Sequence, residues 1–200
     1  MECDLRTVDV IEMGIKYGDL SEGKFDITIG KVTDLWDFHT ENPRIPSEDE
    51  TQSALASVDY KQIRIEGSTV TMENPDGEIN LGGIGKGYIA DRAGEYLEEQ
   101  GVTSAIVNFG GNIVAIGDRD GDDFRIGIEK PFSDRSEIVG AVTVKDATVV
   151  TSGIYERCFE QDGRLYHHIL DVNTGYPADT DVASVTLIAE SGMFGDWDAM

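Results

Sequence analysis

The chain has 200 residues, 40% of them hydrophobic and 28% charged, which suits one sizeable soluble core or two subdomains that share it. Its 39 acidic residues outnumber 16 basic ones, and the formal net charge of −23 excludes nucleic acid and anionic lipid as partners. No apolar run approaches the length of a membrane span, so we expect no membrane insertion, and two cysteines give neither a disulfide framework nor a metal-binding spacing.

Local patterns in the first part of the chain predict two helices and a hairpin. Apolar residues with helical spacing over 5–17 indicate an amphipathic helix, and residues 21–30 indicate a turn followed by a short extended segment. A Ser-Glu-Asp-Glu capping box at 47–50 predicts the start of a second helix. Two short runs of strand-forming residues, 63–65 and 69–72, flank a turn and predict a hairpin.

The rest of the chain is richer in strands. A helix is predicted over 88–100, where Gly101 ends it, and an Asp-Gly pair at 162–163 predicts a tight hairpin turn. Because strands outnumber helices and often follow one another directly, we predict an α+β fold with mixed or antiparallel sheets and flanking helices. The predicted strands are 104–109, 112–116, 124–128, 138–144, 148–151, 155–160, 165–168 and 182–189, and a helical pattern begins at 194.

The sequence NLGGIGKGYIAD at 80–91 carries the clearest signal of chemistry. Four glycines surround Lys86, and a helical pattern follows them directly. Glycine lets backbone N–H groups approach a ligand, and the start of a helix adds donors and partial positive charge, so the loop suits an anionic group such as a phosphate. Its spacing matches neither the Walker A loop nor the dinucleotide-binding glycine motif. The alternative is a tight strand-to-helix turn with an incidental lysine.

Further motifs lie on both sides of this loop. They are KFDITIG at 24–30 with LWDF at 35–38, VNFGGN at 107–112, TSGIYER at 151–157, and YHHILD at 166–171 with NTGYP at 173–177. Together with the loop, these motifs and their order resemble the ApbE-type FAD:protein FMN transferase family from about residue 20 to the end. The resemblance implies a T-fold-like architecture and a single flavin transferase domain over residues 1–200. It also implies truncation at both ends, because the family's first flavin-binding segment has no counterpart here and the last helical pattern stops without a cap.

Members of this family transfer the FMN half of FAD to a threonine hydroxyl of a target protein and release AMP, with Mg²⁺ at the pyrophosphate. The resemblance therefore implies FAD as substrate, Mg²⁺ as cofactor and an acceptor protein as partner. Two alternatives stay open: hydrolysis of FAD to FMN and AMP, and a flavin-binding fragment without catalysis. The family is typically a lipoprotein attached outside the cytoplasmic membrane, which implies an extracytoplasmic location.

By the same resemblance, six positions contact the cofactor. The family's flavin-contacting tripeptide, its loop aspartate, its loop lysine and the apolar residue before the aspartate of its HxID motif each have a counterpart in this chain. At the loop aspartate position the chain has asparagine, which keeps an acceptor but loses the charge. The six counterparts are Lys24, Phe25, Asp26, Asn80, Lys86 and Leu170.

The resemblance also implies two metal ligands. The family's backbone-carbonyl ligand corresponds to Gly83. Its metal-binding aspartate lies four residues before a threonine ligand. Asp198 fits this position best and leaves the threonine beyond the end of the chain, while Asp196 is the alternative register.

His168 is the candidate for acid–base chemistry, with Asp171 to orient it or to position the metal. A histidine with an ordinary pKa of about 6.5 can take a proton from a threonine hydroxyl or assist the departure of AMP. The alternative is a structural hydrogen-bonding role for His167 or His168 at a strand end. For Trp36 and Phe38 we expect a place in the core rather than contact with flavin.

Overall fold

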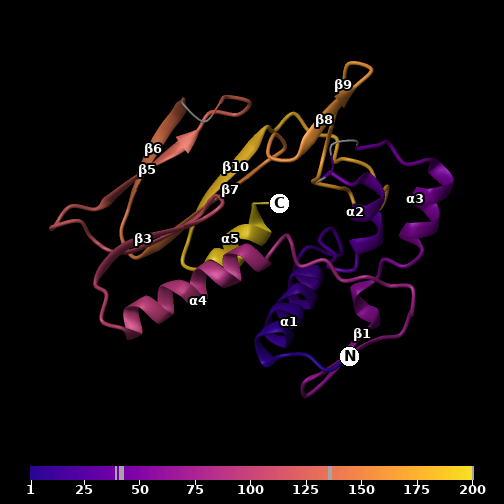
Figure 1. The fold of residues 1–200 in the computed structure, drawn as a ribbon, viewed down its shortest axis with the longest axis horizontal. Helices are drawn as coiled ribbons and strands as arrows, with labels where there is room; N and C mark the ends of the chain where they lie inside the picture. The colour runs from indigo at the N-terminus through magenta and orange to yellow at the C-terminus, as the bar shows by residue number, and fades with distance from the viewer. Residues whose placement is uncertain (39, 41–42, 135–136, 200) are drawn as a thin grey trace. The chain divides into compact units, whose positions relative to one another are not determined.

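The computed structural model describes residues 1–38, 40, 43–134 and 137–199 (Figure 1). The chain forms two compact units. Unit 1 comprises Met1–Leu81 and Glu156–Thr180, and unit 2 comprises Gly82–Tyr155 and Asp181–Met200. The length of the chain allowed either one core or two subdomains, and the single flavin transferase domain expected over residues 1–200 stays a prediction.

Unit 1 combines helices with two antiparallel hairpins, β1–β2 and β8–β9. The predicted capping box forms, because the side chains of Ser47 and Glu50 each accept a hydrogen bond from the other's backbone N–H. The Asp-Gly turn also forms, with a φ angle of 53° at Asp162 and 74° at Gly163. The elements of unit 1 are α1 (Leu5–Leu20), α2 (Gly30–Trp36), α3 (Glu48–Leu55), the 3₁₀ turn η1 (Tyr60–Gln62), β1 (Ile63–Glu66), β2 (Thr69–Met72), β8 (Cys158–Gln161) and β9 (Arg164–His167).

An aromatic cluster forms part of the core of unit 1. Trp36, the last residue of α2, is fully buried, and its indole N–H donates to the carbonyl of Gly175 at 2.8 Å. The prediction that Trp36 is a core residue is therefore confirmed, and Phe38 is half-buried beside it. Four ring centroids lie 5.4–6.4 Å from that of Trp36, and they belong to Phe38, Phe159, Tyr166 and Tyr176.

Helix α2 is the main departure from the sequence prediction, which placed an extended segment up to residue 30 and no helix after it. Its N-cap residue, Ile29, makes no side-chain cap, so the helix lacks a local start signal. Contacts from elsewhere hold it: the N–H of Gly30 donates to the carbonyl of Glu78 at 3.1 Å, and Ile29 forms an isolated parallel bridge to Glu78. Tertiary contacts and the burial of Trp36, rather than helix propensity, therefore stabilise α2.

Unit 2 is built on a four-stranded antiparallel sheet in the order β10-β7-β4-β3, with β5 and β6 as a separate hairpin. The predicted strands of this unit all form, with ends that differ by at most a few residues, and the α+β class is confirmed. The elements are α4 (Gly85–Glu99), β3 (Ser104–Phe109), β4 (Asn112–Gly117), β5 (Phe124–Glu129), β6 (Ile138–Val144), β7 (Ala147–Gly153), β10 (Ser184–Ala189) and α5 (Gly192–Asp198).

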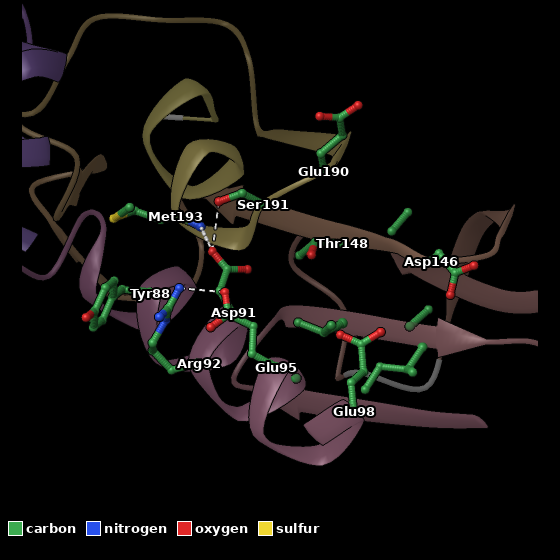
Figure 2. Close-up of a pocket in the computed structure, with 15 residues that line it drawn as sticks. Tyr88, Asp91, Arg92, Glu95, Glu98, Asp146, Thr148, Glu190, Ser191 and Met193 are labelled. Atoms are coloured by element: carbon green, nitrogen blue, oxygen red, sulfur yellow. Dashed lines mark hydrogen bonds and ion pairs between the residues drawn. The ribbon is translucent and has the colours of Figure 1, made fainter. Parts of the chain in front are cut away.

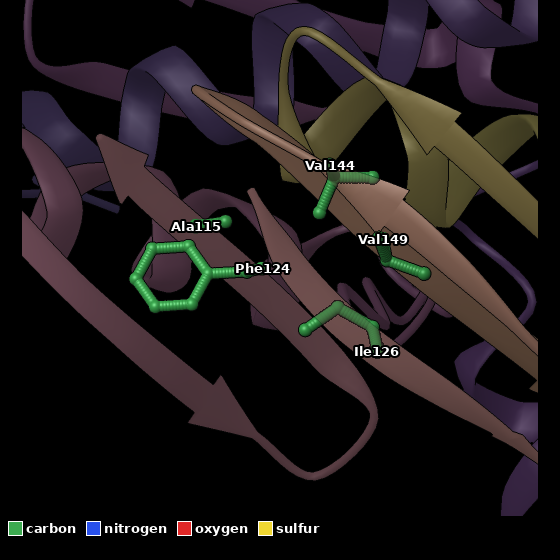
Figure 3. Close-up of a cluster of buried hydrophobic side chains, with 5 residues drawn as sticks. All are labelled: Ala115, Phe124, Ile126, Val144 and Val149. Carbon is green, nitrogen blue, oxygen red and sulfur yellow. The ribbon is translucent and has the colours of Figure 1, made fainter. Parts of the chain in front are cut away.

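The two faces of this sheet pack against different partners. One face meets the β5–β6 hairpin, where a hydrophobic cluster forms from Ala115, Phe124, Ile126, Val144 and Val149 (Figure 3). On the other face lie α4 and α5, so that Val114 of β4 approaches Gly94 of α4 and Val150 of β7 approaches Gly195 of α5. Alternation of side chains along each strand produces this division. The sheet thereby fixes α4 and α5, which carry the residues discussed next.

Candidate functional site

The glycine loop lies at the start of unit 2 and leads directly into α4. The helix begins at Gly85 rather than at the predicted Tyr88, so Lys86 and Gly87 belong to its first turn. Lys86 is exposed, whereas Gly87 is buried. A side-chain cation at the N-terminus of a helix, beside N–H groups that lack intrahelical partners, suits an anionic ligand.

The first turn of α4 is capped from a distant part of the chain. Its N-cap residue, Ile84, makes no side-chain cap, but Oδ2 of Asp196 in α5 accepts a hydrogen bond from the N–H of Gly87 at 2.6 Å. Asp196 is only 3% exposed, and burial raises the pKa of its carboxyl group against opposing effects of Asn112, Gly87 and Lys86. A buried carboxyl group thus faces the loop that carries Lys86.

Asn112, the last residue of the VNFGGN motif, is completely buried in the same region. Its amide lies close enough to Asp196 to lower the pKa of that carboxyl group, yet neither amide atom has a hydrogen-bond partner within the described part of the chain. Buried amides are normally hydrogen-bonded, so the side chain of Asn112 is an exception that needs an explanation. The sequence showed the motif but gave no signal for this role.

In unit 1, the KFDITIG segment folds around the side chain of Asp26. Oδ1 accepts hydrogen bonds from the N–H and the hydroxyl of Thr28 at 2.8 and 2.6 Å, and Oδ2 accepts one from the N–H of Tyr60 at 3.0 Å. Asp26 is 8% exposed, so these bonds fix the backbone of the segment. The predicted contact of Asp26 with the cofactor stays a prediction beside this structural role.

The other predicted cofactor residues of unit 1 differ in exposure. Lys24 is exposed and Phe25 is half-buried. The backbone N–H of Asn80 donates to the carbonyl of Ile27 at 2.7 Å, which brings the start of the NLGGIGKGYIAD sequence against the KFDITIG segment. Two motifs that lie far apart in the sequence therefore meet in this unit.

The ring of His168 contacts the backbone through Nδ1, and its predicted catalytic role stays a prediction. Its Nδ1 lies 3.3 Å from the carbonyl oxygen of Arg157, which also accepts the backbone N–H of His168 at 3.1 Å. A carbonyl oxygen only accepts hydrogen bonds, so we assign the proton of the neutral ring to Nδ1 and leave Nε2 as the basic nitrogen. His167, by contrast, is 5% exposed, and burial lowers the pKa of its imidazole. Of the two histidines, His167 has the surroundings of a structural residue.

Asp171 shapes the turn that follows. Its Oδ1 accepts hydrogen bonds from the backbone N–H and the side-chain amide of Asn173 at 2.8 and 3.0 Å, and its carbonyl accepts the N–H of Gly175 at 2.7 Å. Leu170 forms an isolated antiparallel bridge to Pro177. The structure thus gives Asp171 a role in the DVNTG turn, and its predicted role in orienting His168 or the metal stays a prediction.

Comparison with known proteins identifies the family. The model of the ApbE family matches residues 1–199. The chain belongs to the ApbE family. A relative from Klebsiella pneumoniae (strain 342), named FAD:protein FMN transferase, is 38% identical over 177 residues, and one of the same name from Vibrio cholerae is 36% identical over 194 residues. These alignments cover 88% and 96% of this chain but 54% and 58% of the relatives, so the chain spans about half of their length.

Solved ApbE structures have the same fold. The ApbE protein of Thermotoga maritima superposes with a TM-score of 0.91 at 37% identity, covering 100% of this chain and 65% of the other. The flavin transferase ApbE of Vibrio cholerae superposes with a TM-score of 0.85 at 34% identity, covering 98% and 63%. In the described ranges, no helix is both long and apolar enough to cross a membrane.

For an ApbE-family chain, the donors near the loop fit Mg²⁺ in kind. The carbonyl of Gly83 and the carboxylates of α5 are hard oxygen ligands. No group of three or more His, Cys, Asp or Glu side chains among the described residues could hold a metal by itself. Mg²⁺ is commonly held by one or two carboxylates together with substrate phosphates, so the residues present fit an ion that the substrate helps to bind.

The two candidate metal carboxylates of α5 differ in their surroundings. Asp196 is buried against Gly87, with Oδ2 already accepting an N–H. Asp198, the last residue of α5, is exposed. The structure therefore brings the alternative residue, Asp196, to the glycine loop, and the assignments of Asp198 and Gly83 as metal ligands stay predictions.

A groove of about 420 Å³ runs along α4 beside β4, β7 and the start of α5 (Figure 2). Arg92, its basic residue, is already paired with Glu95 at 2.5 Å. Five carboxylates against one arginine make the charge of the lining negative, so the groove disfavours an anionic ligand such as a phosphate. These carboxylates belong to Asp91, Glu95, Glu98, Asp146 and Glu190.

Proposed function

We propose that the protein transfers the FMN moiety of FAD to a threonine hydroxyl of a target protein and releases AMP, with Mg²⁺ as cofactor. The observation that carries this proposal is the glycine loop, where exposed Lys86 lies in the first turn of α4 beside the buried carboxyl group of Asp196. The names of the relatives, FAD:protein FMN transferase, support the same reaction. On a chain of net charge −23, a dianionic pyrophosphate needs such a local cation.

The chemistry is a displacement at the phosphorus atom on the FMN side of the pyrophosphate. The threonine oxygen forms the new P–O bond, the bond to the bridging oxygen breaks, and AMP leaves with that oxygen. Nε2 of His168 would take the hydroxyl proton, because its Nδ1 proton is directed at the carbonyl of Arg157. Lys86 would bind the pyrophosphate and offset its charge. The carbonyl of Gly83 and a carboxylate of α5 would hold Mg²⁺, which would offset the negative charge of the reacting phosphate.

The test is to incubate the full-length protein with FAD, Mg²⁺ and an acceptor domain that carries the target threonine. Mass spectrometry should show an acceptor that gains one FMN, with AMP released in equal amount. An acceptor with the threonine replaced by valine is the matched control, and chelation of Mg²⁺ should stop the reaction. Intact FAD and an unmodified acceptor would contradict the proposal, whereas free FMN without an adduct would identify an FAD pyrophosphatase.

For location, we propose an extracytoplasmic lipoprotein, as the family resemblance implies. Fractionation of cells that express the full-length protein, followed by detection of a lipid on its N-terminus, tests this. Recovery in the cytoplasmic fraction without lipid would contradict it.

A further inference from the structure

Helices α4 and α5 each provide a carboxylate that accepts hydrogen bonds at the N-terminal end of the other helix. Asp91 of α4 accepts hydrogen bonds from the N–H of Gly192 at 2.6 Å, the hydroxyl of Ser191 at 2.8 Å and the N–H of Met193 at 3.1 Å. Figure 2 shows Asp91 directed at Ser191 and Met193. In return, Asp196 of α5 accepts the N–H of Gly87 in the first turn of α4. We call these residues the carboxylate clasp; they are Gly87, Asp91, Ser191, Gly192, Met193 and Asp196.

The clasp depends on direct backbone contact between the two helices. A Cβ atom added to Gly87 would lie 2.2 Å from the carbonyl oxygen of Gly192 and 2.5 Å from the nitrogen of Met193. A Cβ atom on Gly192 would lie 3.0 Å from both Oδ1 of Asp91 and the carbonyl oxygen of Gly87. These short distances leave no room for a side chain at Gly87. The hydrogen bonds of the clasp therefore depend on glycine at this position.

Each carboxylate also satisfies a need that the local sequence does not meet. The N-cap residue of α4 contributes no side-chain hydrogen bond, so Asp196 supplies the acceptor. Ser191 caps α5 only weakly, with its hydroxyl accepting the N–H of Phe194 at 3.4 Å, and Asp91 takes two further N–H groups of that helix. Negative charge at both helix starts is favourable, because the helix dipoles place positive charge there.

The two ends of the clasp connect groups that the proposed reaction uses. Gly87 follows Lys86 directly, and Gly83 precedes Lys86 in the same glycine loop. Asp196 lies two residues before Asp198 on the same short helix. Because Asp91 holds the start of that helix and Asp196 holds the start of α4, the clasp sets the distance between the glycine loop and the end of α5.

We propose that Asp91 and Asp196 are positioning residues that hold the glycine loop and α5 in register for binding of metal and pyrophosphate. This inference rests on the proposed function. Neither residue needs to touch the substrate. Their effect passes through backbone N–H groups of the loop and of α5, which they keep ordered.

The test compares Asp91→Asn with Glu98→Gln in the full-length protein. Asparagine keeps one acceptor but places an amide nitrogen against a second N–H donor, whereas Glu98 lies on the same helix, lines the same groove and is exposed. Binding of Mn²⁺, as a spectroscopic probe in place of Mg²⁺, is measured in the presence of FAD, together with amide hydrogen exchange over residues 82–88 and 192–198.

We expect Asp91→Asn to weaken Mn²⁺ binding by on the order of 10–100-fold, the usual effect of losing a residue that orients metal ligands. Exchange in both segments should quicken, and Glu98→Gln should change neither measurement. A residue with a merely structural role would lower the melting temperature but leave Mn²⁺ affinity of the folded protein unchanged, which would overturn the proposal. If the wild-type protein transfers no FMN, the proposed function is refuted instead. The hydrogen-exchange data would then still show whether Asp91 orders the glycine loop and α5. If Asp91→Asn does not fold, Ser191→Ala removes one bond of the clasp and is measured in the same way, with a smaller change in the same direction expected.

Discussion

The N–H of Gly87 and the carboxyl group of Asp196 meet at 2.6 Å although 109 residues separate them. This contact joins the first turn of α4, which follows the glycine loop, to a helix packed on β7 and β10. The loop is therefore not held by its own residues alone. The sheet of unit 2 fixes α5, and Asp196 of α5 caps the first turn of α4. This cap therefore fixes the position of Lys86, which lies in the same turn.

Replacing Gly87 with alanine tests how closely the two helices approach. The new Cβ would meet backbone atoms of Gly192 and Met193, which cannot move aside as a flexible side chain does. We expect a loss of about 1–3 kcal/mol in the free energy of unfolding, the usual cost of overpacking, measured by urea denaturation. Gly140→Ala is the control, because a Cβ there has nothing within 4 Å. Equal stability of the two variants would show that α4 and α5 separate easily.

Lys86→Ala should weaken FAD binding without unfolding the protein. Lys86 is exposed, and a charge-assisted hydrogen bond to phosphate is worth roughly 1.5–3 kcal/mol, so we expect the dissociation constant to rise about tenfold or more. Flavin fluorescence during titration measures this. Lys145→Ala removes the same charge from the same unit and breaks the ion pair of Lys145 with Asp118, and it should leave FAD affinity nearly unchanged. Equal losses in the two variants would mean that net charge, not the loop, attracts FAD.

The two adjacent histidines should separate turnover from stability. His168→Asn removes the proposed base and should lower the rate of FMN transfer by on the order of 10²–10⁴-fold, with FAD affinity little changed. His167→Asn alters a buried ring and should lower the melting temperature more than the rate per folded molecule. Single-turnover kinetics and thermal unfolding of both variants check this. A normal rate in His168→Asn would remove that residue from the mechanism.

Asp198→Asn and Asp196→Asn distinguish the two possible metal registers. If Asp198 is the ligand, its replacement should raise the Mg²⁺ concentration needed for activity while stability stays the same, because the side chain is exposed. Asp196→Asn should lower the unfolding temperature in either register, because a buried carboxylate that caps α4 is lost. Mg²⁺ titrations at constant FAD concentration measure the first effect. A normal Mg²⁺ requirement in Asp198→Asn would remove Asp198 from the metal ligands, and Asp196 would then bind the metal in addition to its role in the clasp.

Features of the fold that rest on neighbouring residues were predictable from the sequence. The capping box at Ser47 and the Asp162 turn need only residues within a few positions, and both form. The motifs also predicted the family, because they follow one another along this chain in the order that is typical of the ApbE family. Helix α2 was missed, since its stability comes from burial of Trp36 and from a bond to Glu78 rather than from a local signal.

The candidate site shows the same division. Lys86 was identifiable because glycines and a helical pattern surround it in the sequence. The role of Asp196 in capping α4 was not, since an aspartate near the end of the chain carries no mark of the distant N–H that it accepts. Asp26 is similar: the family resemblance implied a contact with the cofactor, which stays a prediction, whereas the hydrogen bonds of Asp26 to Thr28 and Tyr60 became visible only in the fold.

The buried imidazole of His167 should make stability depend on pH. Burial lowers its pKa in the folded state, so below the ordinary value of about 6.5 the unfolded chain binds more protons than the folded protein. The contribution of this residue to stability is therefore complete above about pH 6.5 and is lost as pH falls through the folded pKa. Urea denaturation from about pH 8 to about pH 5 should show a steeper loss in wild type than in His167→Gln. The carboxylates titrate in both proteins, so the difference between the two curves isolates the histidine. Parallel curves, or an NMR titration of the wild-type ring with an ordinary midpoint, would contradict a neutral buried His167.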